Sequence, residues 1–138
     1  MSNSLEDAES VLINRLLNNI PAGFTLAKIK QPNASGFTTP SDKMLRITVN
    51  TTGLSELDAQ GAFELNTGIL TIDIFYAKGT GSKAALNTAN LIKLLYNGFV
   101  QDDVVVYPVE VIPRGEDENW WRVQVDANFQ FQTLNPNL

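Results

Sequence analysis

The run from Trp120 to Leu134 constrains the fold more than any other part of the sequence. Apolar and polar residues alternate without a break between Trp121 and Gln132. A period of two residues indicates a β-strand with one buried face, because successive side chains of a strand point to opposite sides. The chain must therefore build a sheet that is covered on one side. Its polar side is typical either of a face in water or of a face that meets a neighbouring subunit.

Two stretches have the period of an amphipathic helix instead. Residues 5–19 predict a first helix, with acidic residues in its first turn and Pro21 beyond its end. Residues 82–97 predict a second, between Ser82, which can cap a helix, and Gly98, which can end one. The apolar stripes that face the core include Ala8, Leu12 and Leu16 in the first helix and Ala85, Ala89 and Ile92 in the second.

Further strands are predicted over residues 44–50, 62–76 and 104–112, with a weaker candidate at 24–30. Gly68 can mark a bulge or bend, and Pro108 indicates an edge strand or a bulge, because proline cannot donate to a strand ladder. The polar, Gly- and Pro-containing segments read as loops: 31–43, 51–61 (or the tip of an extended hairpin) and 113–119.

This order of elements predicts an α+β fold. We expect a single mixed β-sheet of four to five strands with two amphipathic helices packed on one face. At 138 residues the chain has the length of one ordinary domain, so we expect residues 1–138 to form a single domain with a loose tail at 135–138.

The composition removes several classes of chemistry. The chain has no Cys and no His, which excludes disulfides, thiol nucleophiles, histidine bases and ordinary Cys/His zinc sites. Ten scattered Lys and Arg against fifteen Asp and Glu give a net charge of −5, so a sequence-independent grip on nucleic acid is not expected. No secretory signal or long apolar run is recognisable, and we expect no membrane association.

Three local patterns could carry chemistry. Residues 79–83 (GTGSK) place glycines before a helix but miss the spacing of a phosphate-binding Walker loop, and a tight turn is the simpler reading. Residues 116–118 offer three carboxylates without the spacing of a calcium loop. Asp73 and Asp126 lie in strands, where each could pair with Arg46 or Arg122. None of these supplies a nucleophile, a base and an orienting group together, so we expect no enzyme and no cofactor.

The order of motifs resembles the phage tail terminator family, including an uncharacterised phage-related tail-completion domain similar to the lambda-type terminator. The resemblance covers roughly residues 5 to 134. It rests on the N-terminal helix LEDAESVLINRLLNNIP, the segment GFTTPSDKMLRITV, the Thr67-Gly68-Ile69-Leu70 strand start, the Gly-x-Gly turn, the helix KAALNTANLIKLLY and the closing strand WWRVQVDANFQFQ.

The resemblance implies assembly rather than catalysis. Members of the family form a ring, commonly of six subunits, on the head-proximal end of the tail tube. The ring ends tube polymerisation and offers a docking surface to the head-tail connector. The implied partners are therefore further copies of this chain, the tail tube protein and the connector or neck protein, in the virion and in the host cytoplasm during assembly. DNA would pass through the lumen without specific binding, because an acidic ring repels it.

Two polar segments are the interface candidates under this resemblance. We expect the loop around residues 54–62 to meet the tube and the loop at 114–118 to meet a neighbouring ring or subunit. The candidate residues are Leu54, Glu56, Leu57, Asp58, Ala62, Arg114, Glu116, Asp117 and Glu118. The alternative readings are a neck or head-completion protein of similar fold, a small phosphate-binding α+β domain at residues 79–83, and a general interaction module.

Overall fold

The computed structural model describes residues 5–57, 61, 63–80 and 82–134. The predicted α+β class is confirmed: two helices cover one face of a mixed sheet. The sheet has seven strands rather than the expected four to five. The additional strands are short or come from the splitting of a predicted one, which is why hydrophobic periodicity did not reveal them.

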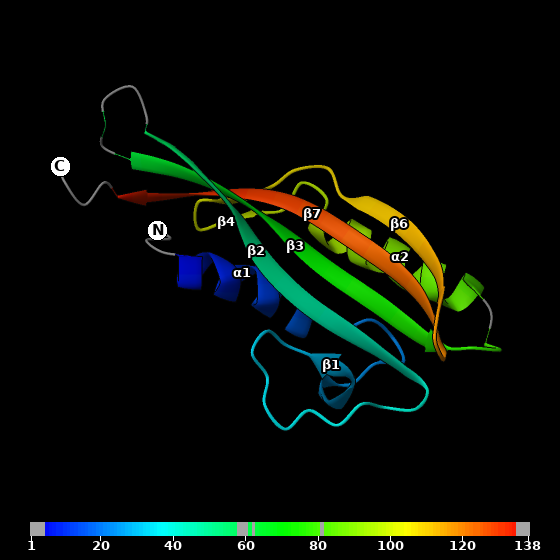
Figure 1. Ribbon diagram of the computed structural model, residues 1–138. Coiled ribbons are helices and arrows are strands. Elements are labelled where there is room, and N and C mark those ends of the chain that lie inside the picture. The colour runs from blue at the N-terminus through cyan, green and yellow to red at the C-terminus, as the bar shows by residue number, and fades with distance from the viewer. Residues whose placement is uncertain (1–4, 58–60, 62, 81, 135–138) are drawn as a thin grey trace.

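The bounds of the elements follow the chain in one order. They are α1 (Leu5–Leu17), the 3₁₀ turn η1 (Leu26–Lys28), β1 (Ile29–Lys30), β2 (Lys43–Leu57), β3 (Phe63–Ala77), α2 (Ser82–Tyr96), β4 (Val100–Gln101), β5 (Val104–Val106), β6 (Glu110–Asp117) and β7 (Trp120–Leu134). Figure 1 shows β2, β3 and β7 as the long diagonal strands of the molecule.

The strands are ordered β1-β2-β3-β7-β5-β4, and β6 also pairs with β7. Only β1 and β2 pair in parallel; all other described pairs are antiparallel. Strand β7 has β3 along one side for its full length, whereas its other side is shared by β6 and β5. The strand with the clearest sequence pattern therefore lies near the centre of the sheet.

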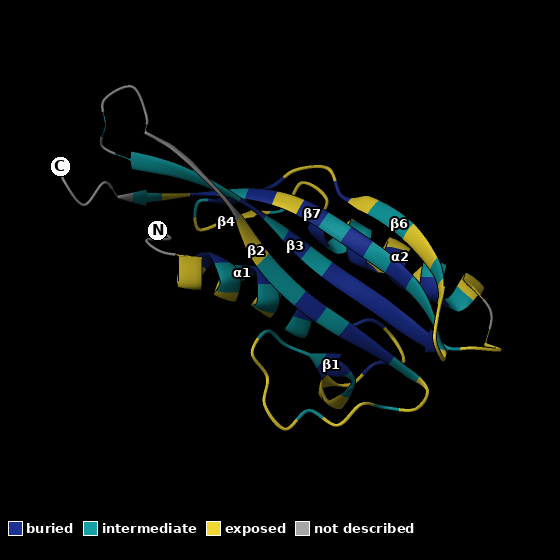
Figure 2. Cartoon of the chain, in the orientation of Figure 1, coloured by how far each residue is buried: buried dark blue, intermediate teal, exposed yellow. Residues whose placement is uncertain are grey.

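The core lies between the sheet and the two helices. Ala8, Leu12 and Leu16 of α1 and Ala85, Ala89 and Ile92 of α2 belong to one buried cluster with the odd-numbered residues of β7, from Val123 to Phe131. Figure 2 shows this burial as dark blue bands along the middle of the long strands. The helices are also joined directly, because Arg15 Nε donates a hydrogen bond to the Leu95 carbonyl at 3.3 Å. No helix in the described ranges has the length and apolar character needed to cross a membrane.

The strand predicted over residues 104–112 is interrupted, which corrects the sequence-based expectation. It divides into β5 and β6 around Pro108, which has no N–H to donate to β7. The break is held on either side: Tyr107 N donates to the Asn128 carbonyl, and Val109 N donates to Asn97 Oδ1, both at 2.9 Å. Pro108 thus ends one strand, and the next starts two residues later.

Two segments expected to be loops are strands. Strand β2 continues through residues 51–57, in agreement with the extended-hairpin alternative, although its register with β3 shifts between Thr51 and Ser55. Strand β6 continues through residues 113–117 with a shift between Pro113 and Gly115, so only Glu118 and Asn119 remain as the turn into β7. Both shifts allow polar, Gly-containing sequences to stay paired with a regular neighbour.

Candidate interaction face

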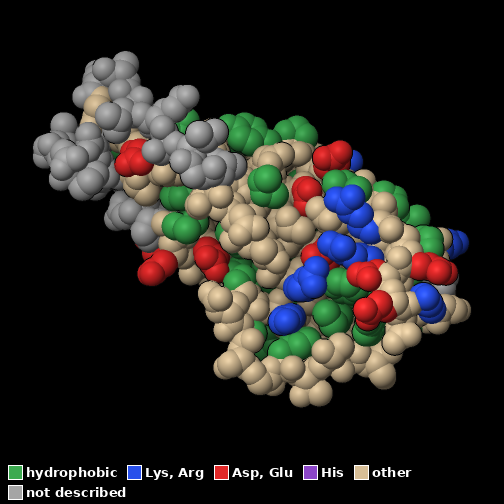
Figure 3. All heavy atoms as spheres, viewed as in Figure 1, with side chains coloured by type: hydrophobic (Ala, Val, Ile, Leu, Met, Phe, Trp, Pro, Cys, Tyr) green, Lys and Arg blue, Asp and Glu red, His purple; other side chains and the backbone are tan. Residues whose placement is uncertain are grey.

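The sheet has one face without helices, which we call the open face. It carries the even-numbered residues of β7 and their cross-strand neighbours. Arg46 of β2, Asp73 of β3 and Gln124 of β7 are directly opposite one another, and Thr71 is opposite Asp126. In the view of Figure 3, Lys and Arg side chains gather over the middle of this face with acidic side chains among them. Strand alternation puts these charges outside the main core.

Asp73 is the central residue of the open face. It is only 2% exposed although no helix covers it. Its Oδ2 accepts from Arg46 Nη2 at 2.9 Å and Nε at 3.3 Å, and its Oδ1 accepts from Arg122 Nη2 at 2.7 Å and Nε at 3.0 Å. A buried charge is tolerated only when it is paired and hydrogen-bonded, and two fork-shaped guanidiniums meet that requirement. Asp73 therefore fixes the two arginines in place.

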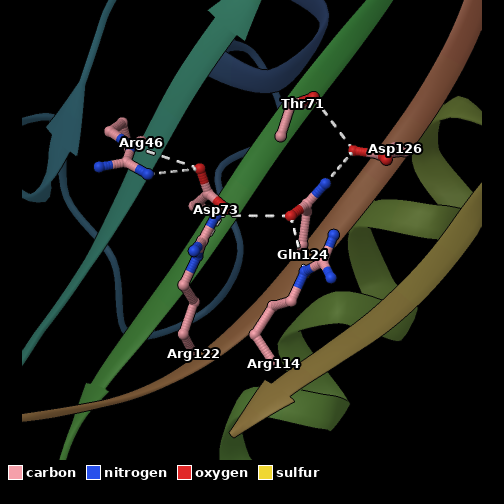
Figure 4. Close-up of polar contacts among 7 residues, drawn as sticks. All are labelled: Arg46, Thr71, Asp73, Arg114, Arg122, Gln124 and Asp126. Carbon is pink, nitrogen blue, oxygen red and sulfur yellow. Dashed lines mark hydrogen bonds and ion pairs between the residues drawn. The ribbon is translucent and has the colours of Figure 1, made fainter. Parts of the chain in front are cut away.

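The hydrogen bonds continue from Arg122 across β7, as Figure 4 shows. Arg122 Nη2 and Arg114 Nε both donate to Gln124 Oε1, at 3.4 and 3.0 Å. Gln124 Nε2 in turn donates to Asp126 Oδ1 at 2.8 Å, and Thr71 Oγ1 donates to the same oxygen at 3.0 Å. We call these seven residues the polar network; they connect β2, β3, β7 and β6.

Aromatic side chains surround the arginine end of the polar network. Phe75 is buried on the open face and packs edge-on against Trp120, with ring centroids 6.0 Å apart. The guanidinium carbons of Arg46 and Arg122 lie 5.1 and 5.9 Å from the centre of the Phe75 ring, within the range of cation–π attraction. The arginines are thus positioned by a carboxylate and by a ring.

This arrangement suits recognition of another surface. Each oxygen of Asp73 already accepts two N–H groups, so the carboxylate is held as an ion-pair partner. Arginines held beside aromatic rings are the side chains most enriched in protein interfaces. Within the described ranges, no three His, Cys, Asp or Glu side chains come together as a metal-binding group.

The predicted contact residues at the far end of β2 lie on a long hairpin. The backbones of Glu56 and Leu57 pair with Leu65 and Glu64 of β3. Leu54 lies within the register shift of the same strand. Asp58 and Ala62 lie outside the described residues.

The other predicted contact residues lie on a strand and a turn rather than on a loop. Arg114, Glu116 and Asp117 belong to β6, and Glu118 is in the turn, where its φ of 55° is in the left-handed region. Arg114 is exposed and joins the polar network, whereas Glu116 lies 3.7 Å from Lys78 Nζ. Pairing with β7, which the sequence pattern did not reveal, places them there.

The two sets of predicted contact residues lie at opposite ends of the sheet. Glu64 at one end of β3 pairs with Thr133, and Ala77 at the other end pairs with Trp120. At about 3.3 Å per residue, these ends are roughly 40 Å apart. A single copy therefore has two well-separated surfaces.

The turn at residues 79–83 borders a pocket of about 290 Å³. Lys78, Gly79, Ser82, Glu116 and Trp121 line it, and Gly81 lies outside the described residues. The indole Nε1 of Trp121 is buried and has no hydrogen-bond partner in the described part of the chain. A lysine and a free N–H favour an anion there, whereas the Glu116 carboxylate on the same wall opposes one.

No family model matches the chain, and no curated protein matches it in sequence. Nine chains of solved structures match it in three dimensions. One of them, whose name states no function, is similar with a TM-score of 0.67 and 17% identity, over 91% of this chain and 94% of the other. A likeness at this identity shows that the two chains share a fold, and a fold alone does not specify a function.

Proposed function

We propose that this chain is a structural subunit of a phage tail terminator. In this role, copies form a closed ring on the head-proximal end of the tail tube, stop its polymerisation and present the docking surface for the head connector. The proposal rests on the sequence resemblance across residues 5–134 and on an α+β fold that agrees with it.

The observation that carries the proposal is the separation of the predicted contact residues along β3 and β7. A terminator needs two different axial contacts, one with the tube and one with the connector side. The hairpin end at Leu54–Leu57 and the turn end at Glu116–Glu118 lie roughly 40 Å apart on the same rigid strands. A ring subunit also needs side surfaces that fit the next copy without two-fold symmetry, and the open face and the helical layer are two such unlike sides.

The electrostatics agree with a passage for DNA. Each subunit has a net charge of −5, so a ring is strongly acidic as a whole. An acidic lumen repels the phosphate backbone and lets DNA slide. In this arrangement, Arg46, Arg114 and Arg122 of the open face contact protein rather than the lumen.

The test combines light scattering over a concentration series with negative-stain imaging, with and without purified tail tubes. The expected result is a closed ring, of a mass about six times the 15.2 kDa of one subunit, or a cap on one end of each tube. Co-purification with heads instead of tails would favour the neck-protein alternative. A monomer that ignores tubes at every concentration contradicts the ring.

Charge reversal locates the contact. Arg114→Glu alters an exposed residue whose side chain makes one hydrogen bond, to Gln124, so the fold should persist. We expect this variant to lose ring formation or tube capping. Lys93→Glu on α2 is the matched control, because it makes the same charge change on a different surface. Equal loss in both variants would indicate a general effect of charge.

A further inference from the structure

The outer edge of β2 is paired over only two residues of its length. Strand β1 pairs with Leu45 and Arg46, and in the described part of the chain no strand pairs with this edge from Ile47 onward. The neighbouring chain leaves the edge because Pro32 follows β1 closely and Asn33 has a φ of 56°, in the left-handed region. An unpaired edge is a template for another strand.

The backbone of this edge has free hydrogen-bonding groups facing outward. Ala77 N donates to the Asp42 carbonyl at 2.8 Å, so Asp42 bonds on the β3 side. The register between β2 and β3 is continuous from Lys43 to Thr51, and strand residues alternate the side on which they bond. The N–H and C=O groups of Ile47 and Val49 therefore point away from β3, toward the unpaired edge.

A groove lies along this edge and has room for an extended segment. It has a volume of about 320 Å³ and runs between residues 30–33, Glu9 of α1 and residues 46–50 of β2. A second hollow shares Glu9, Gln31 and Asn33 with it and extends along α1 past Ile13. A segment that continues the line of β1 would lie in this groove.

The opposite edge of the sheet is protected, which makes the open edge of β2 more significant. Strand β6 carries Pro113, a register shift at Arg114 and several exposed acidic residues, all of which discourage strand addition. The edge of β2 from Ile47 to Asn50 has neither a proline nor a charged residue. The two edges thus differ in the features that normally block pairing.

The charges beside the groove select the segment that fits. Lys30 pairs with Arg46 across β1 and β2, so both cations are on the open-face side. A guest residue opposite Thr48 would follow Lys30 in line and lie diagonal to Arg46. The guest residues on either side of it would point toward the helical layer, where Val49 and Ile13 are only partly buried. An acidic residue flanked by two apolar ones meets both conditions.

We propose that the edge of β2 at residues 47–50 binds an extended, acidic segment of a partner protein by strand addition. The segment has an apolar–acidic–apolar core: its backbone pairs with Ile47 and Val49, and its carboxylate faces Lys30 and Arg46. This inference does not depend on the proposed ring, because it concerns a peptide-binding edge that a single copy already possesses.

The test is an NMR titration of the full-length, isotope-labelled chain with the capped peptide STVEVTS, and with STVKVTS as its charge-reversed counterpart. The amide resonances of residues 47–50 are expected to shift with the acidic peptide. Binding of the lysine peptide should be about fivefold weaker, in line with one partly exposed charge pair. Tube capping is measured separately, so failure of one proposal leaves the other standing.

Lys30→Glu is the matched variant, because Lys30 is part of the groove and Arg46 is needed to hold Asp73. It should weaken the acidic peptide and favour the lysine peptide, whereas Lys93→Glu should bind as the wild type does. Three results would overturn the proposal: no shifts at millimolar peptide, shifts confined to other surfaces, or shifts of residues 47–50 that depend on protein concentration alone. The last would show that a second copy of the chain occupies the edge.

Discussion

The hydroxyl of Tyr96 on α2 donates a hydrogen bond of 2.5 Å to the backbone carbonyl of Leu12 on α1. Both side chains are buried, and the bond joins two helices that are 84 residues apart in the sequence. With the Arg15 bond to Leu95, it fixes how the helices lie against each other on the sheet.

Replacing Tyr96 by phenylalanine should cost about 1 kcal/mol of unfolding free energy, because the ring stays buried and only one hydrogen bond is lost. Chemical denaturation near neutral pH measures this difference. Leu94→Ala, on the exposed side of the same helix, is the control and should change stability by less than about 0.5 kcal/mol.

The same tyrosine predicts a pH dependence. Burial raises the pKa of Tyr96 above its ordinary value of 10.0, so the unfolded chain ionises before the folded one does. The stability contributed by the protonated hydroxyl is complete below pH 10.0 and declines as the pH rises beyond it. Denaturation at about pH 8 and about pH 11 should therefore show a smaller gap between wild type and Tyr96→Phe at the higher pH. A constant gap would contradict the assignment.

Asp73→Asn should destabilise the fold by about 2–3 kcal/mol, because two guanidiniums lose the carboxylate that both of them face. Their partial exposure keeps the loss below that of a fully buried pair. Asp126→Asn is the matched control, since its carboxylate accepts only from the neutral Thr71 and Gln124 and should cost about 1 kcal/mol. Equal losses would show that Asp73 has no special role.

Gly68→Ala should cost about 1–3 kcal/mol through overpacking. A Cβ at Gly68 would lie 2.6 Å from Cζ of Phe129 and 2.7 Å from the Asn50 carbonyl oxygen. The first clash can be relieved by Phe129→Leu, so the double variant should lose less than the sum of the two single ones. Strict additivity in thermal or chemical denaturation would show that the ring does not limit this position.

Phosphate and nucleotides at about 10 mM should not raise the melting temperature specifically, because Glu116 lies on the wall of the pocket at Lys78 and Gly79. Phosphate strengthens apolar burial in general, so the informative comparison is with Lys78→Gln. A rise that this variant abolishes would favour the phosphate-binding alternative over the structural one.

Much of the fold could be predicted because its signals are local. The alternation in β7 and the stripes of α1 and α2 each lie within one segment, and each predicted element is present. The division at Pro108 and the continuation of β6 past Pro113 depend instead on pairing with β7. Strands β1 and β4 have two residues each, too few for a period to be visible.

The open face could be predicted only in part for the same reason. Strand position indicated that Asp73 could pair with Arg46 or Arg122, and the structure confirms that it pairs with both. Asp126, given the same expectation, accepts from Thr71 and Gln124 instead. These choices follow from registers between strands far apart in the sequence, and a one-residue slip would have moved every one of these side chains to the other face.

Proline at position 113 also sets how many times this sheet can be extended. A sheet with two receptive edges can be joined to further copies of itself without end, as happens in fibrils. Here β6 carries the proline and the register shift, and β2 carries the free backbone groups. The sheet can thus accept one added strand and then presents the guest's far side as its new border. Such a subunit can be stored at high concentration in a cell full of copies without growing into a fibre.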